Sequence, residues 1–296
     1  MKTMITIDAL NYDQRKLHRL LLGSVAPRPI AFASTIDKAG NPNLSPFSFF
    51  NAFGVNPSTL IFSPSRRGGD NTTKDTYENL KEVPEVVINM VNYEMVQQIS
   101  LASSKYPKGV NEFVKAGFTP LESESVKPFR VKESPVQLEC SVRQIIETGD
   151  GAGAANLIVC EVLKMHINKE VLDENGEIDV LKIDLVGRMG GNYYVRTNGK
   201  AAFIVPKPLS TPGIGIDVLP DQIKFNPLLT GNDLGRLGSI DKFPDKILID
   251  KQKLSLQTIA NENDLIVKVR LLIENDKTEE ALALLLAFYA NDKADK

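Results

Sequence analysis

The first two-thirds of the chain contain short apolar runs that are rich in β-branched residues. Residues that favour turns separate these runs from one another. Runs of this kind are typical of β-strands. We expect strands at residues 28–36, 60–63, 85–92, 136–149, 155–167 and 190–197. Because turns join these strands, rather than long helices in regular alternation, the pattern favours a mainly β barrel or sandwich over a doubly wound parallel sheet.

Helical patterns are confined to short segments in the first part of the chain and to two longer segments at its end. We expect helices at residues 73–82, 93–102, 111–118, 263–276 and 278–290. The last helix begins with Thr278, Glu279 and Glu280, which suit a helix start. Its apolar residues cover much of its surface, so we expect it to pack against other elements.

The composition changes near residue 206. Residues 206–227 are rich in proline and glycine and have little regular pattern, which predicts an extended arm or linker. We therefore expect a β-barrel domain with short helices over residues 1–205. Residues 206–296 are expected to form the arm and the C-terminal helices.

Composition and charge narrow the classes of partner. The hydrophobic fraction of 42% and the charged fraction of 24% allow a sizeable globular core. The net charge is −2, and no basic block predicts a nucleic-acid or membrane surface. No apolar run has the length of a membrane span or the form of a signal peptide. Cys140 and Cys160 form no CxxC pair, so we expect reduced, buried thiols in a cytoplasmic protein.

The segment GDGAGA at residues 149–154 matches a variant of the dinucleotide fingerprint. That fingerprint requires a helix after the glycines, whereas the residues that follow are β-branched and strand-like. We interpret the segment as a hairpin turn. Neither His18 nor His166 has neighbours at metal-ligand spacing, and the sequence predicts no metal site.

Two stretches carry candidate chemistry. Residues 63–76 combine serines, threonines, two arginines and a lysine with glycines, just before a helix start. Arginine and lysine side chains with free N–H groups can bind a phosphate. The alternative is a solvated loop that caps the helix, and on this stretch alone the alternative is slightly favoured.

The second stretch, residues 45–51, is SPFSFFN. Its small hydroxyl and amide side chains could bind the edge of a flat heteroaromatic ring while phenylalanine and proline cover the face of that ring. The alternative is a strand whose phenylalanines fill a barrel core. Together, the two stretches could hold a ring and a phosphate of one molecule.

A resemblance to a known family supports that combination. The segments PRPIAFASTIDKAGNPNLSPFSFFNAFGVNPSTLIFS, RRGGDNTTKDTYENL and EVVINMVN strongly resemble the flavin reductase-like family of FMN-binding split-barrel proteins. The likeness continues in order through ESPVQLECSVRQIIETG and GRMGGNYYVRT, over about residues 10–200. It implies a six-stranded antiparallel FMN-binding split barrel, usually a homodimer with FMN near the interface. The last fifty residues carry no such resemblance, and we expect their helices to form a C-terminal extension.

The resemblance also implies the cofactor-binding residues. Ser34 and Thr35 are expected to end a strand beside the flavin, and Phe47, Ser48, Phe49, Phe50 and Asn51 to lie along its ring. Ser63, Arg66, Lys74, Asp75 and Thr76 are expected around the phosphate, where Asp75 would orient Lys74 or cap the helix. Tyr193 or Tyr194 would close the pocket, from the partner subunit.

The implied activity is hydride transfer from NADH or NADPH to the N5 atom of FMN. Such a flavin reductase or oxidoreductase needs no acid or base side chain, in agreement with the absence of a catalytic cluster from the sequence. The alternative is a non-catalytic FMN electron-transfer protein with a protein redox partner. A third reading is a binding module, with the C-terminal helices docking another protein.

Overall fold

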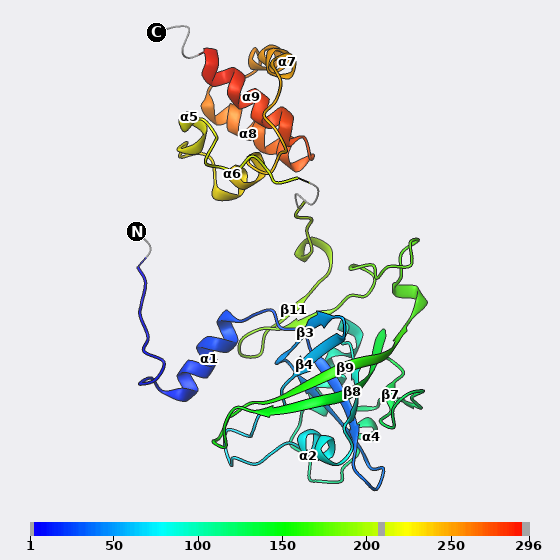
Figure 1. Ribbon diagram of the computed structural model, residues 1–296. Helices are drawn as coiled ribbons and strands as arrows, with labels where there is room; N and C mark the ends of the chain where they lie inside the picture. The colour runs from blue at the N-terminus through cyan, green and yellow to red at the C-terminus, as the bar shows by residue number, and fades with distance from the viewer. Residues whose placement is uncertain (1–2, 207–210, 292–296) are drawn as a thin grey trace. The chain divides into compact units, whose positions relative to one another are not determined.

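The computed structural model describes residues 3–206 and 211–291 (Figure 1). These residues form two compact units, Met1–Phe203 and Ile204–Lys296. The first contains all the strands of the described residues, and the second is helical. A large antiparallel sheet with short helices, followed by a helical C-terminal region, confirms the expected fold class.

A seven-stranded sheet forms the body of the first unit. Its order is β2-β1-β5-β8-β9-β4-β3, and every neighbouring pair is antiparallel. The strands are β1 (Ala31–Ile36), β2 (Pro42–Phe47), β3 (Phe50–Val55), β4 (Ser58–Phe62), β5 (Glu85–Asn89), β8 (Val136–Glu147) and β9 (Asn156–Ile167). Bulges in the long β8–β9 pair interrupt the register after Glu139 and after Val142, and bulges of this kind increase strand twist and bending.

The two strands at opposite ends of the sheet order are consecutive in the sequence. Only Ser48 and Phe49 separate β2, which pairs with β1, from β3, which pairs with β4. One bent segment, residues 42–55, therefore pairs with both sides of the sheet and brings its two ends together. Counting this segment as one strand gives the six strands expected of a split barrel.

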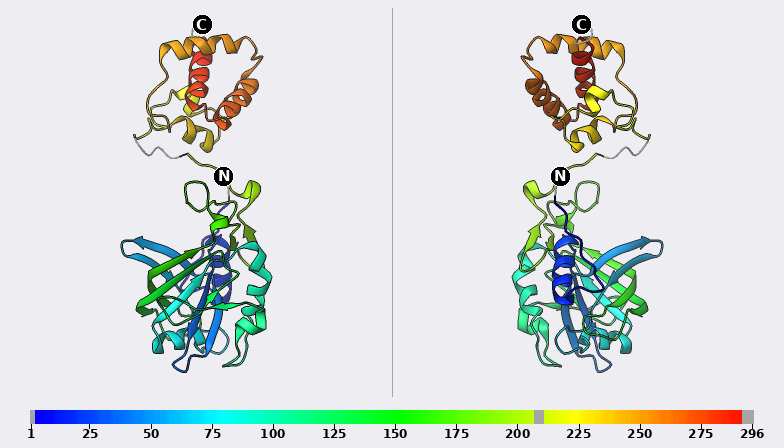
Figure 2. Two further views of the ribbon diagram at one scale, coloured as in Figure 1. Left: turned by 90° about the vertical axis from the view of Figure 1, so that its right-hand side faces the viewer. Right: turned by 90° about the vertical axis from the view of Figure 1, so that its left-hand side faces the viewer.

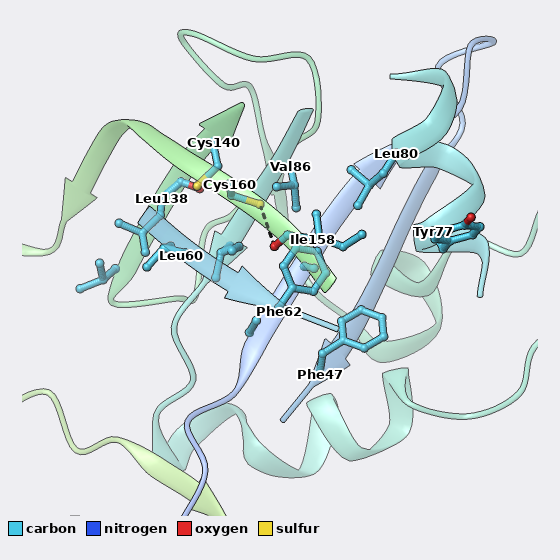
Figure 3. Close-up of a cluster of buried hydrophobic side chains, with 14 of the residues drawn as sticks. Phe47, Leu60, Phe62, Tyr77, Leu80, Val86, Leu138, Cys140, Ile158 and Cys160 are labelled. Atoms are coloured by element: carbon cyan, nitrogen blue, oxygen red, sulfur yellow. Dashed lines mark hydrogen bonds between the residues drawn. The ribbon is translucent and has the colours of Figure 1, made fainter. Parts of the chain in front are cut away.

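The interior of the barrel is filled by side chains from strands that are far apart in the sheet order. Phe47 of β2 and Phe62 of β4 pack with ring centroids 5.6 Å apart (Figure 3). Both belong to a core cluster that β1, β5, β8 and β9 complete. Helix α2 (Asp75–Glu82) adds Tyr77 and Leu80 to this cluster, and so covers part of the barrel interior.

A second cluster covers the outer face of β1 and β2. Phe32 and Leu44 pack there against α3 (Val96–Ala102) and α4 (Glu112–Ala116). Alternate residues of β1 thus face two different cores, because side chains alternate across a strand. This explains why all six residues of β1 are buried.

Shorter elements complete the first unit. They are α1 (Gln14–Ser24), η1 (Tyr93–Met95), β6 (Pro120–Leu121), β7 (Arg130–Val131), η2 (Lys169–Val171), β10 (Val186–Arg188), β11 (Tyr194–Arg196) and η3 (Gly199–Ala201). The strand expected at residues 190–197 is present only as β11, which pairs with β10. Met189–Tyr193 instead form a turn, which the backbone bond from Tyr193 N–H to the Gly190 carbonyl closes.

The described residues of the second unit form five helices around one apolar core. They are α5 (Asp221–Lys224), α6 (Gly231–Leu237), α7 (Lys246–Leu256), α8 (Glu262–Glu274) and α9 (Thr278–Asn291). Thr230, Asp245 and Asn261 accept hydrogen bonds from backbone N–H groups in the first turns of α6, α7 and α8. Helix α9 is central: six of its residues from Ala281 to Ala287 are buried. Its expected packing against other elements is confirmed.

The structure differs from the arm that the sequence predicts at residues 206–227. Residues 207–210 lie outside the described part of the chain. Farther along, Leu219 and Ile223 are buried in the core of the second unit, and α5 begins at Asp221. The prolines and glycines suppress a regular pattern without preventing burial, because isolated apolar side chains of an irregular segment can still fill a core.

We propose that the two units are independent folding domains, because each has its own core. A chain that ends at residue 206 should remain soluble and unfold cooperatively, with the β-type far-UV circular dichroism of the full-length protein. Thermal unfolding followed by circular dichroism checks this. An insoluble product, or one without a cooperative transition, would show that the helical unit is needed to complete the barrel.

Candidate functional site

A polar pocket of about 150 Å³ lies beside the free edge of β2. Five segments surround it: β2, the loop before α2, the start of α2, the turn after α3, and α4. The lining residues are Asn43, Ser45, Arg67, Lys74, Asp75, Ser103, Ser104, Lys105, Tyr106 and Glu112. Segments far apart in the sequence thus contribute to one small site.

A buried hydrogen-bond network fixes the start of α2 against the strands. Asn43 Nδ2 donates to Thr76 Oγ1 at 2.9 Å and to Thr35 Oγ1 at 3.3 Å. Asn79 Nδ2 also donates to Thr35 Oγ1, at 3.2 Å. All four side chains are buried, so their polar atoms are satisfied by one another. Lys74 and Asp75 are held in place because Thr76 follows them directly.

Three cationic side chains line the pocket, namely Arg67, Lys74 and Lys105. Lys105 Nζ lies 2.7 Å from Asp70 Oδ2, and Arg67 donates to Thr72 Oγ1 and to the Thr73 carbonyl. The Lys74 ammonium group makes no hydrogen bond or ion pair within residues 3–206 and 211–291. Burial lowers the pKa of Lys74, and the positive charge of Arg67 lowers it further. A half-buried, unpaired ammonium group of this kind is ready to bind an anion.

The loop that carries Arg67 is held by its own side chains. Arg66 donates through Nε to Asn71 Oδ1 at 2.7 Å and through Nη2 to the Asn71 carbonyl at 2.6 Å. Asn71 has a φ of 56°, in the left-handed region that asparagine tolerates, and its amide donates to the Asp150 carbonyl. Arg66 therefore shapes the loop, whereas its neighbour Arg67 lines the pocket.

Two carboxylates face the same pocket. Asp75 is the first residue of α2, a position where a negative charge is favourable. Glu112 of α4 is 8% exposed, and its Oε2 accepts a hydrogen bond from the Leu44 N–H at 3.0 Å. This bond satisfies a backbone donor on the free edge of β2. Burial raises the pKa of Glu112, and Asp75 contributes in the same direction.

The bend between β2 and β3 lies farther along the same strand. The buried Arg28 guanidinium contacts Ser48 Oγ at 3.4 Å and donates to the carbonyls of Leu22, Val25 and Met189. It thereby joins the end of α1, the bend and the turn after β10. At the bend itself Phe49 is 44% exposed, with its ring 6.4 Å from that of His18, and Asn51 of β3 is exposed.

The structure brings together some of the residues that the sequence predicts around a cofactor and separates others. Lys74 and Asp75 line the pocket, and Thr35 and Thr76 support it. Phe47 is a core residue, and Phe50 packs against the same core. Buried Ser63 Oγ lies 3.2 Å from Ser65 Oγ.

Ser34 and Thr35, adjacent in β1, point to opposite faces of the sheet. Ser34 pairs with Leu44 and shares its outer face, and the Ser34 Oγ is buried without a hydrogen-bond partner among the described residues. The family resemblance assigns twelve residues to the cofactor, from Ser34 to Thr76, and this assignment stays a prediction.

Sequence reasoning missed most of the pocket. The sequence offered both Arg66 and Arg67 as phosphate donors, but only the fold of the loop decides which arginine lines the pocket. Lys105 and Glu112 come from segments that carry no local motif. Only the packing of α3 and α4 on the outer face of β2 brings them to the site.

The donor set indicates what the pocket can hold. Arg67 and Lys74, with the hydroxyls of Ser103 and Ser104, suit a phosphate.

In the described part of the chain no group of His, Cys, Asp and Glu side chains is placed to hold a metal ion. Both cysteines are buried in the barrel core, and burial raises the pKa of both thiols, that of Cys140 to about 12. Within the same residues, no helix is both long and apolar enough to span a membrane.

Solved structures show the same fold. Nitrilotriacetate monooxygenase component B from Bacillus cereus is 28% identical, with a TM-score of 0.64 over 69% of this chain and 100% of that one. The 2-nitrobenzoate 2-nitroreductase NbaA from Pseudomonas fluorescens is 26% identical, with a TM-score of 0.60 over 71% and 100%. A split-barrel domain protein from Shewanella frigidimarina has a TM-score of 0.56 at 23% identity, covering 67% of this chain and 94% of its own.

Sequence comparison gives the same result. An uncharacterized protein of Aquifex aeolicus is 40% identical over 188 residues, which cover 64% of this chain and 93% of that protein. The uncharacterized protein YwrF of Bacillus subtilis is 29% identical over 206 residues, 69% of this chain and 100% of its own. The family described as "Flavin reductase like domain" matches residues 22–184. The chain therefore belongs to the flavin reductase-like family of split-barrel proteins.

Proposed function

We propose that this protein is an NAD(P)H-dependent FMN reductase. The observation that carries the proposal is the half-buried, unpaired Lys74 beside Arg67 in a pocket that also offers two serine hydroxyls. In a chain of the flavin reductase-like family, this pocket is suited to the phosphate of FMN. Riboflavin, which has no phosphate, would leave these charges unused.

The residues have separable tasks under this proposal. Lys74 and Arg67 would bind the phosphate, and the network of Thr35, Asn43 and Thr76 would keep the pocket in shape before the cofactor arrives. Ser48 and Asn51 would bind the polar edge of the ring, with Phe49 against its face. Bound FMN would supply the redox chemistry, accepting a hydride at N5 from NADH or NADPH.

Two similar proteins support an oxidoreductase. The structures that match at 28% and 26% identity are named as a monooxygenase component and a nitroreductase. The electron-transfer alternative predicts the same cofactor but slow reaction with nicotinamides, so one experiment separates the two. The buried, unpaired cysteines accord with a cytoplasmic protein.

We also propose a homodimer in which a second copy covers the exposed apolar surface around the bend. Phe53 and Val55 of β3 are 64% and 92% exposed, and the β3–β4 hairpin projects from the barrel (Figure 2). Helix α1 has no buried residue, and its Leu20 and Leu21 side chains are 46% and 51% exposed. The proposed ring site at Ser48–Asn51 adjoins both surfaces, because Phe49 lies beside His18 of α1 and β3 continues from Phe50 to Val55.

The purified protein with added FMN should show flavin absorption bands and bleach when NADH or NADPH is added without oxygen. The visible absorption spectrum measures both steps, and the faster donor identifies the preferred nicotinamide. Bands that persist with either donor would favour the electron-transfer alternative. Absence of any bound flavin would contradict both readings.

Replacing Lys74 tests the phosphate assignment. Lys74→Gln removes a charge-assisted hydrogen bond worth roughly 1.5–3 kcal/mol, so FMN should bind about 10- to 100-fold more weakly. Fluorescence titration with FMN and with riboflavin measures the effect, and riboflavin affinity should not change. The matched control is Lys81→Gln on the exposed side of the same helix. An equal loss for both flavins would place the phosphate elsewhere.

Phe53→Asp tests the dimer. Sedimentation should give the wild-type protein twice the 32.6 kDa chain mass, and the variant the mass of one chain, because a buried carboxylate opposes association. Phe225→Asp, at a residue of the second unit that is 72% exposed, is the control and should remain dimeric. A monomeric wild-type protein at all accessible concentrations would refute the dimer.

A further inference from the structure

The pocket proposed for the cofactor phosphate contains two carboxylates, and this composition is unexpected for a site that binds an anion. Asp75 and Glu112 both line it. Of the three cations, Lys105 is already paired with Asp70 at 2.7 Å. That leaves the positive charges of Arg67 and Lys74 opposite the two carboxylates, with no surplus of positive charge. A phosphate dianion entering this pocket would meet repulsion from an ionised Glu112.

Glu112 is the carboxylate placed to relieve that repulsion. It is 8% exposed, and its Oε2 is occupied by the Leu44 N–H. A proton on the other oxygen, Oε1, would leave the bond to Leu44 intact and give the pocket a new donor. A protonated carboxyl group both removes one negative charge and can donate a hydrogen bond to a phosphate oxygen.

The surroundings favour such a protonated form. Burial raises the pKa of Glu112, the hydrogen bonds from the N–H groups of Leu44 and Glu112 itself lower it, and Asp75 raises it again, with a net upward shift. The other charged or titratable groups that line the pocket are Arg67, Lys74, Lys105 and Tyr106. A bound dianion would raise the pKa of Glu112 further, because a nearby negative charge disfavours the ionised carboxylate.

We propose that Glu112 binds the phosphate monoester of the cofactor in its protonated form, so that the binding of the phosphate dianion is coupled to the uptake of a proton. The inference rests on the proposed FMN function and adds a residue that determines specificity for the phosphate. When the phosphate dianion binds, one proton is transferred from solvent to Glu112 Oε1. No covalent bond of the cofactor forms or breaks in this step.

The sign of the pH dependence follows from this coupling. The pKa of Glu112 is higher with the phosphate bound than without it. Affinity for the dianion is therefore greatest below the pKa of the free protein and falls as the pH rises toward that of the complex. The second pKa of a phosphate monoester is about 6, so above about pH 7 the ligand itself no longer changes charge. From there upward, FMN affinity should fall by up to about tenfold per pH unit.

Glu112→Gln provides the test. Its amide oxygen can accept from the Leu44 N–H while its NH₂ group donates to the phosphate, as the protonated acid would. We expect FMN to bind this variant as tightly as it binds the wild-type protein near pH 7, with little change up to about pH 8.5, above the ligand's own titration. Fluorescence titration measures the dissociation constants. The control Glu174→Gln, at an exposed residue of a turn, should keep the wild-type pH dependence.

Calorimetry gives a second measurement that needs no variant. Titration of the wild-type protein with FMN, in buffers of different ionisation enthalpy, should show a net proton uptake on binding and none with riboflavin. No proton uptake, or an unchanged pH dependence in Glu112→Gln, would overturn the role of Glu112 while leaving FMN binding intact. If the wild-type protein binds neither flavin, the proposed function itself fails, and the role of Glu112 fails with it.

Discussion

The structure of the first unit depends on the pairing of one short segment with both sides of the sheet. Residues 42–47 pair with β1 and residues 50–55 with β4, so only Ser48 and Phe49 can form the bend. The two registers together decide which side chains face the core, since a slip of one residue would reverse them. Phe47 meets Phe62 inside the barrel, whereas Phe49 remains at the surface.

The same segment determines where the pocket can form. The outer edge of β2 has no neighbouring strand in the sheet order, and its Leu44 N–H is taken by Glu112 of α4. Asn43 links that strand to the start of α2 through Thr76. The edge of the sheet is thus covered by helices whose ends carry charges. An exposed strand edge would otherwise be open to pairing with another chain.

Sequence patterns predicted the elements whose periodicity is long and regular. The β8–β9 hairpin and helix α8 were found for that reason, whereas α9 was found from its start at Thr278–Glu280 and its apolar run. Helix α1 was missed, although Leu17, Leu20 and Leu21 have helical spacing. In the pocket, local chemistry pointed to Lys74 and Asp75, because both belong to a polar loop that starts a helix. Glu112 could not be found in this way, since its role arises from contact with a strand nearly seventy residues away in the sequence.

The helical unit contributes no described residue to the pocket. Its core is made by its own helices, and the buried Asp233 carboxylate is paired within it, with Arg270 Nη2 lying 3.0 Å from Asp233 Oδ2. The YwrF protein of Bacillus subtilis is matched over 100% of its length by 206 residues, which are 69% of this chain. The pocket residues all belong to the first unit. The charge balance around Glu112 is therefore a property of the barrel and the helices that cover it.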